Sequence, residues 1–277
     1  MVAASGIDIP SLTSSQFATV YNLFSLVIAS MLFTAIYLLL SRSRVAPRYR
    51  NALVVSAMVC GIAAYHYFRI FNNFNESYPP GADVLANHAL SNIQFNEAYR
   101  YVDWLLTVPL LLVETIAVMA LGKSEQRGLL MKLVPASALM ILLGYPGEIA
   151  TATGTRAIWG ILSTIPFIYI LYVLFVELSK SLDRQPREVI QTIKTLRLSL
   201  VVLWCVYPVA YLFPIIGGSF FGGSNGFVLR QAGYSIADIL AKAAYGLVIF
   251  RIARMKSELE DVEYDDHPQT VRERVAA

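Results

Sequence analysis

The sequence predicts an all-α membrane protein that folds as one bundle of seven transmembrane helices. Of the 277 residues, 56% are hydrophobic and only 15% are charged, and the mean hydropathy of +0.56 is too high for an ordinary soluble domain. Seven apolar runs recur, most of them near the roughly 20 residues that cross a bilayer as a helix. They lie at residues 15–42, 51–72, 98–121, 128–146, 157–180, 197–217 and 231–252, and the fourth is expected to be the shortest helix.

The basic residues predict the orientation, because Lys and Arg in short loops are retained on the cytoplasmic side. The connections after the first, third and fifth runs are basic, whereas no Lys or Arg lies before Arg42 or between Arg69 and Arg100. We therefore expect the N-terminus outside and the C-terminus in the cytoplasm, in a cell membrane, with the bacterial inner membrane as the expected location. The chain then divides into an outer segment, a helical domain and a cytoplasmic tail, at residues 1–14, 15–255 and 256–277. The net charge of +3 follows from this topology and indicates no nucleic-acid partner.

The first two helices follow from their apolar runs. Neither a basic n-region nor a small-residue cleavage site precedes the first run, so this helix is expected to be its own insertion signal. The second helix runs from the inside outward and carries His66 in GIAAYHYFRIF. Counting from the outer ends of helices two and three puts His66 and Asp103 at the same depth, about 12 Å. The two side chains could share a proton, or His66 could be hydrogen-bonded elsewhere in the bundle.

The third helix, with the sequence RYVDWLLTVPLLLVE, carries ionisable side chains at membrane depth, where each costs at least a few kcal/mol. Arg100, Asp103, Thr107 and Glu114 fall within about 60° of one another on a helix. Asp103 lies in the outer half, and Glu114 lies about 16 Å further inward. The stripe is a series of proton-holding groups across the membrane, although Arg100 alone could be a solvated end charge.

Two cysteines and two outer loops complete the sequence features. Cys60 and Cys205 fall in apolar runs without metal-ligand spacing, so we expect two structural thiols and no metal site. The loop NNFNESYPPGADVLANHALSNIQFNEAY, rich in Asn, Pro and Gly, could form a short hairpin or cap over the bundle. The loop IGGSFFGGSNG before the last helix is expected to be flexible and contains no acid.

The seventh helix carries Asp238 one turn before Lys242, on the same face. Such a pair can be a structural ion pair. A desolvated lysine amine can instead react with an aldehyde to form a Schiff base. The spacing alone does not choose between these two uses.

Taken in order, these patterns resemble the microbial (type 1) rhodopsins. The third helix reads R-Y-x-D-W-x-x-T-x-P with an acid eleven residues after the Asp, and the seventh contains D-x-x-x-K. The segments WGILSTIPFIYILYVLFVEL and LWCVYPVAYLFP extend the resemblance over about residues 15–255, most closely to the xanthorhodopsin and Gloeobacter rhodopsin branch. The resemblance implies a light-driven outward proton pump, which is a transporter and not an enzyme.

The resemblance also implies a role for each intramembrane charge. Lys242 would carry all-trans retinal as a protonated Schiff base, with Asp103 and Asp238 as counterions. Asp103 would be the primary proton acceptor and Glu114 the cytoplasmic proton donor. His66 would share a proton with Asp103, and Arg100 would link Asp103 to the exit side.

The pocket residues are implied in the same way. An aromatic box around the polyene is matched by Trp104, Trp204, Tyr207, Pro208 and Tyr211. The ring end is matched by Met140, Gly144, Trp159, Ser163, Thr164 and Phe167. Leu111 occupies the position where related proteorhodopsins have Leu for green absorption. Gly160 matches the glycine that opens a lipid-facing slot for a carotenoid antenna in xanthorhodopsin-like members, although a glycine in a transmembrane helix is also commonly a packing device.

Alternatives stay open at this point. The set Asp103, Thr107 and Glu114 resembles outward proton pumps and disfavours a sodium pump, a chloride pump or a channel. A sensory photoreceptor that signals through a partner protein is the alternative. Haloarchaeal pumps release protons through extracellular glutamates, but residues 217–230 contain no acid, so the release group is unassigned. The family commonly forms trimers or pentamers, so a homo-oligomer is expected.

Overall fold

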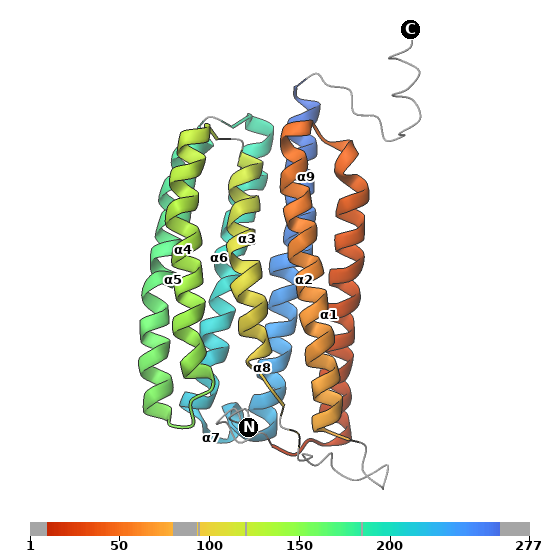
Figure 1. The fold of residues 1–277 in the computed structure, drawn as a ribbon, viewed down its shortest axis with the longest axis vertical. Coiled ribbons are helices and arrows are strands. Elements are labelled where there is room, and N and C mark those ends of the chain that lie inside the picture. Colours follow the sequence, from red (N-terminus) through yellow and green to blue (C-terminus); the bar gives the residue numbers. More distant parts are fainter. Residues whose placement is uncertain (1–9, 80–92, 94, 120, 184, 261–277) are drawn as a thin grey trace.

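The computed structural model describes residues 10–79, 93, 95–119, 121–183 and 185–260 and confirms the predicted seven-helix bundle (Figure 1). Six helices are α1 (Ser14–Leu40), α2 (Pro47–Ser77), α3 (Tyr99–Met119), α4 (Lys123–Glu148), α5 (Thr153–Leu182) and α6 (Arg187–Ile216). Each of these is long and apolar enough to span a membrane. The seventh column is continuous but has three parts, α8 (Gly223–Asp238), a π-helical segment (Ile239–Ala244) and α9 (Tyr245–Glu258).

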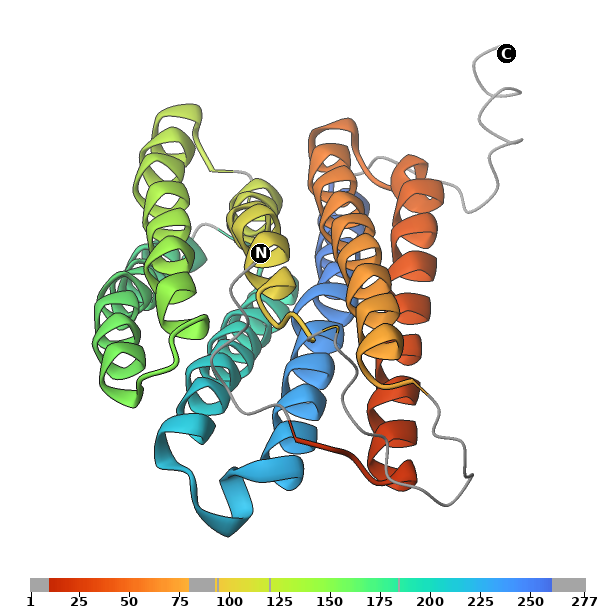
Figure 2. The same ribbon diagram turned by 60° about the horizontal axis from the view of Figure 1, so that its bottom comes forward.

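The seven columns form a closed ring. Each of α1 to α6 packs against its neighbour in sequence, and α8 closes the ring by packing against both α6 and α1 (Figure 2). The ring places the inward face of α3 opposite the seventh column, so that residues far apart in sequence can meet in the interior.

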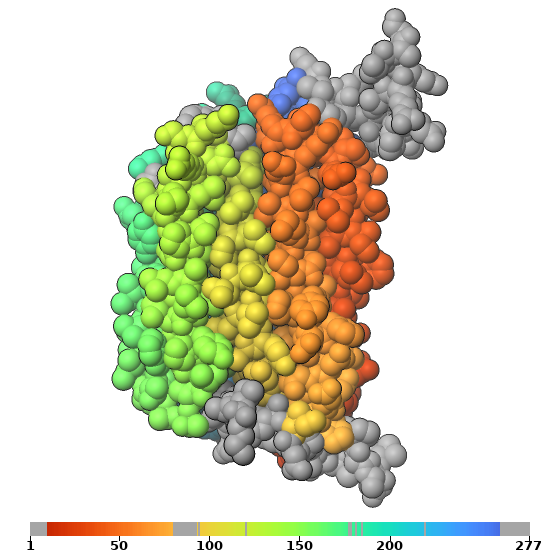
Figure 3. Space-filling view, viewed as in Figure 1, coloured from red at the N-terminus to blue at the C-terminus, as the bar shows by residue number. Residues whose placement is uncertain are grey.

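Side-chain burial distinguishes the interior of the ring from its perimeter. Large apolar side chains on the outside remain uncovered, among them Phe33, Leu40 and Ile161, at 67%, 76% and 67% exposure. In water such a surface would be unfavourable, but in a bilayer it contacts lipid. Figure 3 shows α2, α3 and α4 packed side by side along one face of this surface. The burial pattern therefore agrees with a multi-pass membrane protein.

Several predictions about helix lengths and boundaries are wrong; α6, for example, begins at Arg187, ten residues before the predicted start. The fourth helix is not the shortest, because α4 has 26 residues and α3 has 21. A charged and polar first turn, starting at Lys123, extends α4 beyond its apolar run. The seventh column starts at Gly223, eight residues before the predicted start. Its first turns are polar, so they did not belong to the apolar run from which the start was predicted.

The connection before α8 is more ordered than expected. It contains a four-residue helix, α7 (Gly218–Phe221), between glycines with positive φ, 63° at Gly217 and 58° at Gly223. Gln16, which also closes a capping box with Thr13 at the start of α1, donates hydrogen bonds to Ser224 and Asn225. This contact fixes the outer end of α8 against α1.

Some expectations fall on residues outside the described part of the chain. Helix α2 continues to Ser77, and the expected hairpin in the following loop falls mostly on residues 80–92 and 94. The first nine residues of the outer segment and residues 261–277 of the tail also lie outside the described residues.

Candidate functional site

Lys242 lies in the π-helical segment at the centre of the bundle, between two carboxylates. Its Nζ donates a hydrogen bond to Asp103 Oδ2 on α3 and lies 3.1 Å from Asp238 Oδ1, one turn earlier in its own column. All three side chains are at most 2% exposed. The expected proximity of Asp238 and Lys242 is therefore confirmed, and α3 contributes a second acid to the same cation.

The two carboxylates differ in how they are held. Asp238 accepts a hydrogen bond from Tyr67 of α2 at 2.7 Å and one from Tyr207 of α6 at 2.6 Å. In Asp103, by contrast, Oδ1 is buried without a hydrogen-bond partner among the described residues. Charge-assisted hydrogen bonds such as the two that Asp238 accepts fix and stabilise a carboxylate. Asp238 is thus the fixed acid of the pair, and Asp103 has a free oxygen.

His66 lies beside Asp103, as the depth estimate predicted. Its Nδ1 is 3.9 Å from Asp103 Oδ1, beyond hydrogen-bond distance, and 3.0 Å from the backbone oxygen of Ile62. Thr107 donates to the backbone oxygen of Asp103, not to the carboxylate. The structure thus shows the hydrogen-bonded alternative directly and places His66 beside Asp103, while a shared proton between the two stays a prediction.

Glu114 is fully buried in the inner half of the bundle. It faces Ser56 of α2 and forms no ion pair among the described residues. The next residue, Thr115, is hydrogen-bonded to Tyr245 of α9 at 2.6 Å. An isolated ionised carboxylate in such surroundings would cost several kcal/mol. The neutral form, which carries a proton, is the one that this environment accommodates.

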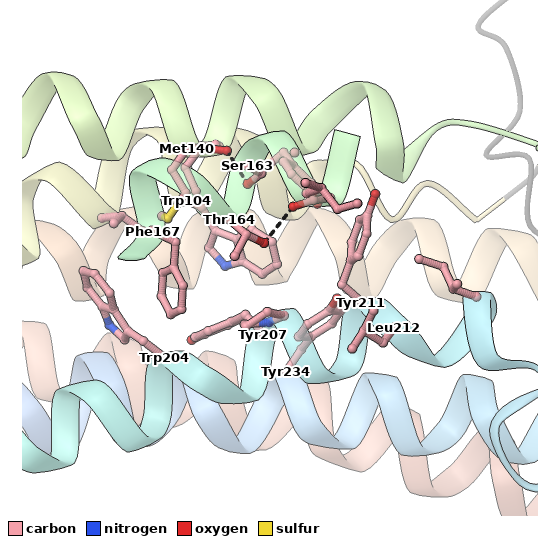
Figure 4. A pocket seen from close by; sticks show the side chains of 18 of the residues that line it. Trp104, Met140, Ser163, Thr164, Phe167, Trp204, Tyr207, Tyr211, Leu212 and Tyr234 are labelled. Carbon is pink, nitrogen blue, oxygen red and sulfur yellow. Dashed lines mark hydrogen bonds between the residues drawn. The ribbon is translucent and has the colours of Figure 1, made fainter. Parts of the chain in front are cut away.

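A mostly apolar cavity of about 480 Å³ extends from Lys242 between α3, α4, α5 and α6. Figure 4 shows Trp104, Trp204, Tyr207 and Phe167 around this elongated space. Of the thirteen pocket residues named from the sequence, twelve line the cavity: Trp104, Leu111, Met140, Gly144, Gly160, Ser163, Thr164, Phe167, Trp204, Tyr207, Pro208 and Tyr211. Trp159 does not, because it projects from the adjacent position of α5, where its Cβ lies near Gly147.

The family assignment follows from comparison with known proteins. Residues 18–255 match the family described as bacteriorhodopsin-like protein. The chain belongs to this family. Family membership supports rhodopsin-type light-driven transport as the general activity, and not a classical enzymatic one.

Individual relatives agree with the family match. The chain is 29% identical to a green-light absorbing proteorhodopsin of a gamma-proteobacterium over 237 residues, covering 84% of this chain and 86% of the relative. It is 35% identical to bacteriorhodopsin of Halobacterium salinarum over 186 residues, covering 65% and 68%. The solved structure of xanthorhodopsin, described as a light-driven ion pump with dual chromophore, superposes with a TM-score of 0.85 at 44% identity, covering 92% of this chain and all of that one.

Two glycines of this bacteriorhodopsin-like chain shape the cavity. A Cβ on Gly144 would lie 3.0 Å from Tyr101 Cε1, and one on Gly160 would lie 2.7 Å from Tyr211 Cε1. Both glycines therefore permit a ring to pack directly against a helix backbone. The cavity wall continues from Gly160 to Ile161 and Leu212, which are exposed on the perimeter.

The cysteines play no part in the site. Cys60 is buried, as expected, but Cys205 is exposed on the perimeter of α6, so it is not a core thiol. Within the described residues, no group of His, Cys, Asp and Glu has the arrangement of a metal site.

Sequence reasoning missed several polar side chains of the interior. Tyr67 and Tyr234 carry no charge in the sequence, and nothing in their spacing points to the site. A second buried cluster consists of Glu97, Glu148, Arg156, Arg230 and Gln231. The only signal in the sequence for this second cluster is the position of its residues near the ends of predicted helices.

Proposed function

We propose that this protein is a light-driven outward proton pump in which retinal bound to Lys242 supplies the energy. The observation that carries the proposal is the Lys242 amine at the wall of an apolar cavity and between two buried acids, one of which has a free oxygen. An ion pair that only stabilised the fold would need no cavity of this kind beside it.

The cavity fits retinal in size and chemistry. Its volume of about 480 Å³ falls in the range of roughly 300–1,000 Å³ typical of small-molecule pockets, and its walls are mainly aromatic and aliphatic. The lysine amine at its wall is the group that bonds covalently to an aldehyde. All-trans retinal bound to Lys242 would supply absorption of visible light and a photoisomerisation.

The arrangement of the acids supports Asp103 as the proton acceptor. Asp103 Oδ2 already accepts a hydrogen bond from Lys242 Nζ, so a proton on that nitrogen has a short path to it. Both oxygens of Asp238 are occupied, by Tyr67, Tyr207 and Lys242. A proton on Asp238 would disrupt these contacts, whereas a proton on Asp103 replaces the contact with Lys242.

Glu114 gives the transfer its direction. It lies eleven residues beyond Asp103 on α3, about 16 Å further toward the basic, inner end. Its environment accommodates the proton-carrying form, so it can return a proton to Lys242 from the inside. Acceptance by Asp103 on the outer side and return from Glu114 on the inner side move one proton outward per cycle.

We also propose that Gly160 opens a site for a carotenoid antenna. The cavity reaches the lipid-facing perimeter at this residue, between α5 and α6. Xanthorhodopsin, the dual-chromophore pump to which the chain is similar, supports this assignment by analogy. A homo-oligomer, trimer or pentamer, stays a prediction of the family resemblance.

Illumination of an unbuffered suspension of cells that express the protein, with added retinal, tests the function. A pump acidifies the medium promptly, and a protonophore abolishes the signal. A signal of opposite sign that the protonophore enhances would show transport of another ion. No pH change together with a slow photocycle would favour the sensory photoreceptor.

A further inference from the structure

A second buried polar cluster lies at the outer end of the bundle. This outer cluster consists of Glu97, Glu148, Arg156, Arg230 and Gln231, and each of these side chains is at most 3% exposed. Arg230 Nη2 lies 2.6 Å from Glu97 Oε2, and Gln231 donates to Glu97 Oε1. Arg156 lies 3.8 Å from the Glu148 carboxylate and also donates to the Glu148 backbone oxygen. Four chain segments thus bring two acids into one polar site.

The two acids face the same surroundings. Glu148 interacts electrostatically with Glu97 and with Arg230 as well as with Arg156, and Tyr101 donates to it at 3.5 Å. Three more tyrosines interact electrostatically with these acids, Tyr78 with Glu97, Tyr211 with Glu148 and Tyr234 with both. The Tyr78 and Tyr211 hydroxyls themselves donate to the backbone oxygens of Pro10 and Arg156. Glu148 Oε1 is buried without a hydrogen-bond partner among the described residues. The cluster therefore has an oxygen that can take up a proton.

Arg100 connects the outer cluster to the central site. It donates to Gln231 Oε1 at 2.7 Å, and Gln231 in turn contacts Glu97. Arg100 also precedes Asp103 by one turn of α3, and its Nε and Nη1 are buried without hydrogen-bond partners in the described part of the chain. Arg100 is thus a buried link and not a solvated end charge. A hydrogen-bonded path therefore runs from Arg100 through Gln231 to Glu97, and it begins one turn of α3 before Asp103.

The buried charges of the centre and the outer half balance one another. Among the described residues, the cations are Arg100, Arg156, Arg230 and Lys242, and the acids are Glu97, Asp103, Glu148 and Asp238. When all are ionised, the set is neutral and holds no spare proton on an acid. A proton that moves from Lys242 to Asp103 leaves this total unchanged. Only a proton from Glu114 adds a positive charge, which the loss of a proton to the outside removes.

We propose that the outer cluster is the proton exit relay, and that it works late in the cycle. The proposal rests on the proposed pump. After Lys242 has regained a proton from Glu114, the O–H bond of Asp103 breaks and its proton forms an O–H bond on Glu97, the acid that the path from Arg100 through Gln231 reaches. That carboxyl then passes the proton to water at the outer surface and returns to its ionised form. One proton leaves for each proton that Glu114 supplies.

The test follows two signals after a light flash on the purified protein reconstituted with retinal. A water-soluble pH-sensitive dye reports release into the medium, and the infrared carbonyl band of protonated Asp103 reports when Asp103 loses its proton. In the wild type, release coincides with the loss of the Asp103 band and follows reprotonation of Lys242. Release before the Asp103 band decays would overturn the relay, because it would require an acid that carries a proton at rest.

A charge-balanced variant tests the residues themselves. Glu97→Gln together with Arg230→Gln removes both partners of one ion pair, so no unpaired charge is left buried. We expect dye release and Asp103 deprotonation to slow by about tenfold or more, as for loss of a positioned proton acceptor, while reprotonation of Lys242 keeps its rate. The control is Glu188→Gln, an exposed glutamate in the first turn of α6 at the inner end.

The outcomes separate the relay from the pump. If proton release has the same timing in the Glu97 and Arg230 double variant as in the wild type, the relay is overturned and the proposed pump is not. No light-dependent dye signal in the wild type would overturn the pump and, with it, the relay. The wild-type time course needs no variant, so the proposal is tested even if the double variant does not fold.

Discussion

Replacing Glu114 by Gln isolates the proton-donor role. The amide has nearly the volume of the neutral acid and enters a fully buried position that has no ion pair among the described residues, so packing changes little. The substitution removes the proton that lies about 16 Å inward of Asp103. A replacement proton must then enter past the end of α3, five residues and about 7.5 Å beyond position 114.

The expected magnitude follows from this longer path. A positioned general acid contributes about 10²- to 10⁴-fold to a proton transfer. We take the lower limit, about 100-fold, because Ser56 and the Thr115–Tyr245 hydrogen bond leave polar groups in the inner half. A 100-fold slower reprotonation of Lys242 corresponds to about 2.7 kcal/mol of additional barrier.

Flash photolysis of the purified protein measures this step directly, as the return of a proton to the Lys242 nitrogen. In the Glu114→Gln variant the proton comes from the medium, so the rate falls about tenfold for each unit that the pH rises. In the wild type the internal donor makes the rate nearly independent of pH. An unchanged rate, or the same pH dependence in both proteins, would refute the donor role.

Three further predictions concern the pocket. Lys242→Ala should leave the protein without visible absorption after addition of retinal, and a persistent colour would show that the chromophore is bound elsewhere. Gly160→Trp should remove the carotenoid contribution from the action spectrum while the retinal band stays, whereas Trp at the exposed Gly154 of the same helix should leave both bands. Tyr207→Phe removes one hydrogen bond to Asp238, worth about 1.5–3 kcal/mol because its acceptor is charged, so thermal bleaching should occur at a lower temperature; an unchanged bleaching temperature would contradict this contribution.

The central site was largely predictable from the sequence because helical spacing fixes both face and depth. Asp238 and Lys242 are one turn apart, so their contact follows from local geometry alone. The proximity of His66 and Asp103 followed from counting residues along two helices of known direction. The role of each residue, in contrast, came from the family resemblance and stays a proposal.

The outer cluster was not predictable because its contacts join distant segments. Arg100 and Gln231 are 131 residues apart, and Gln231 and Glu97 are 134 apart. Glu97 lies just before α3 and Glu148 at the end of α4, where a charged residue in a sequence is ordinarily solvated. Their burial depends on how the helix ends pack, which neither hydropathy nor spacing reports.

The direction of light-driven proton flux tests the central claim most directly. Membrane vesicles of opposite orientation, right-side-out and inverted, are loaded with retinal and illuminated in unbuffered medium. An outward pump acidifies the medium around right-side-out vesicles and makes it alkaline around inverted ones, and a protonophore abolishes both signals. Signals of reversed sign, or none in either orientation while the protein absorbs visible light, would contradict outward proton pumping.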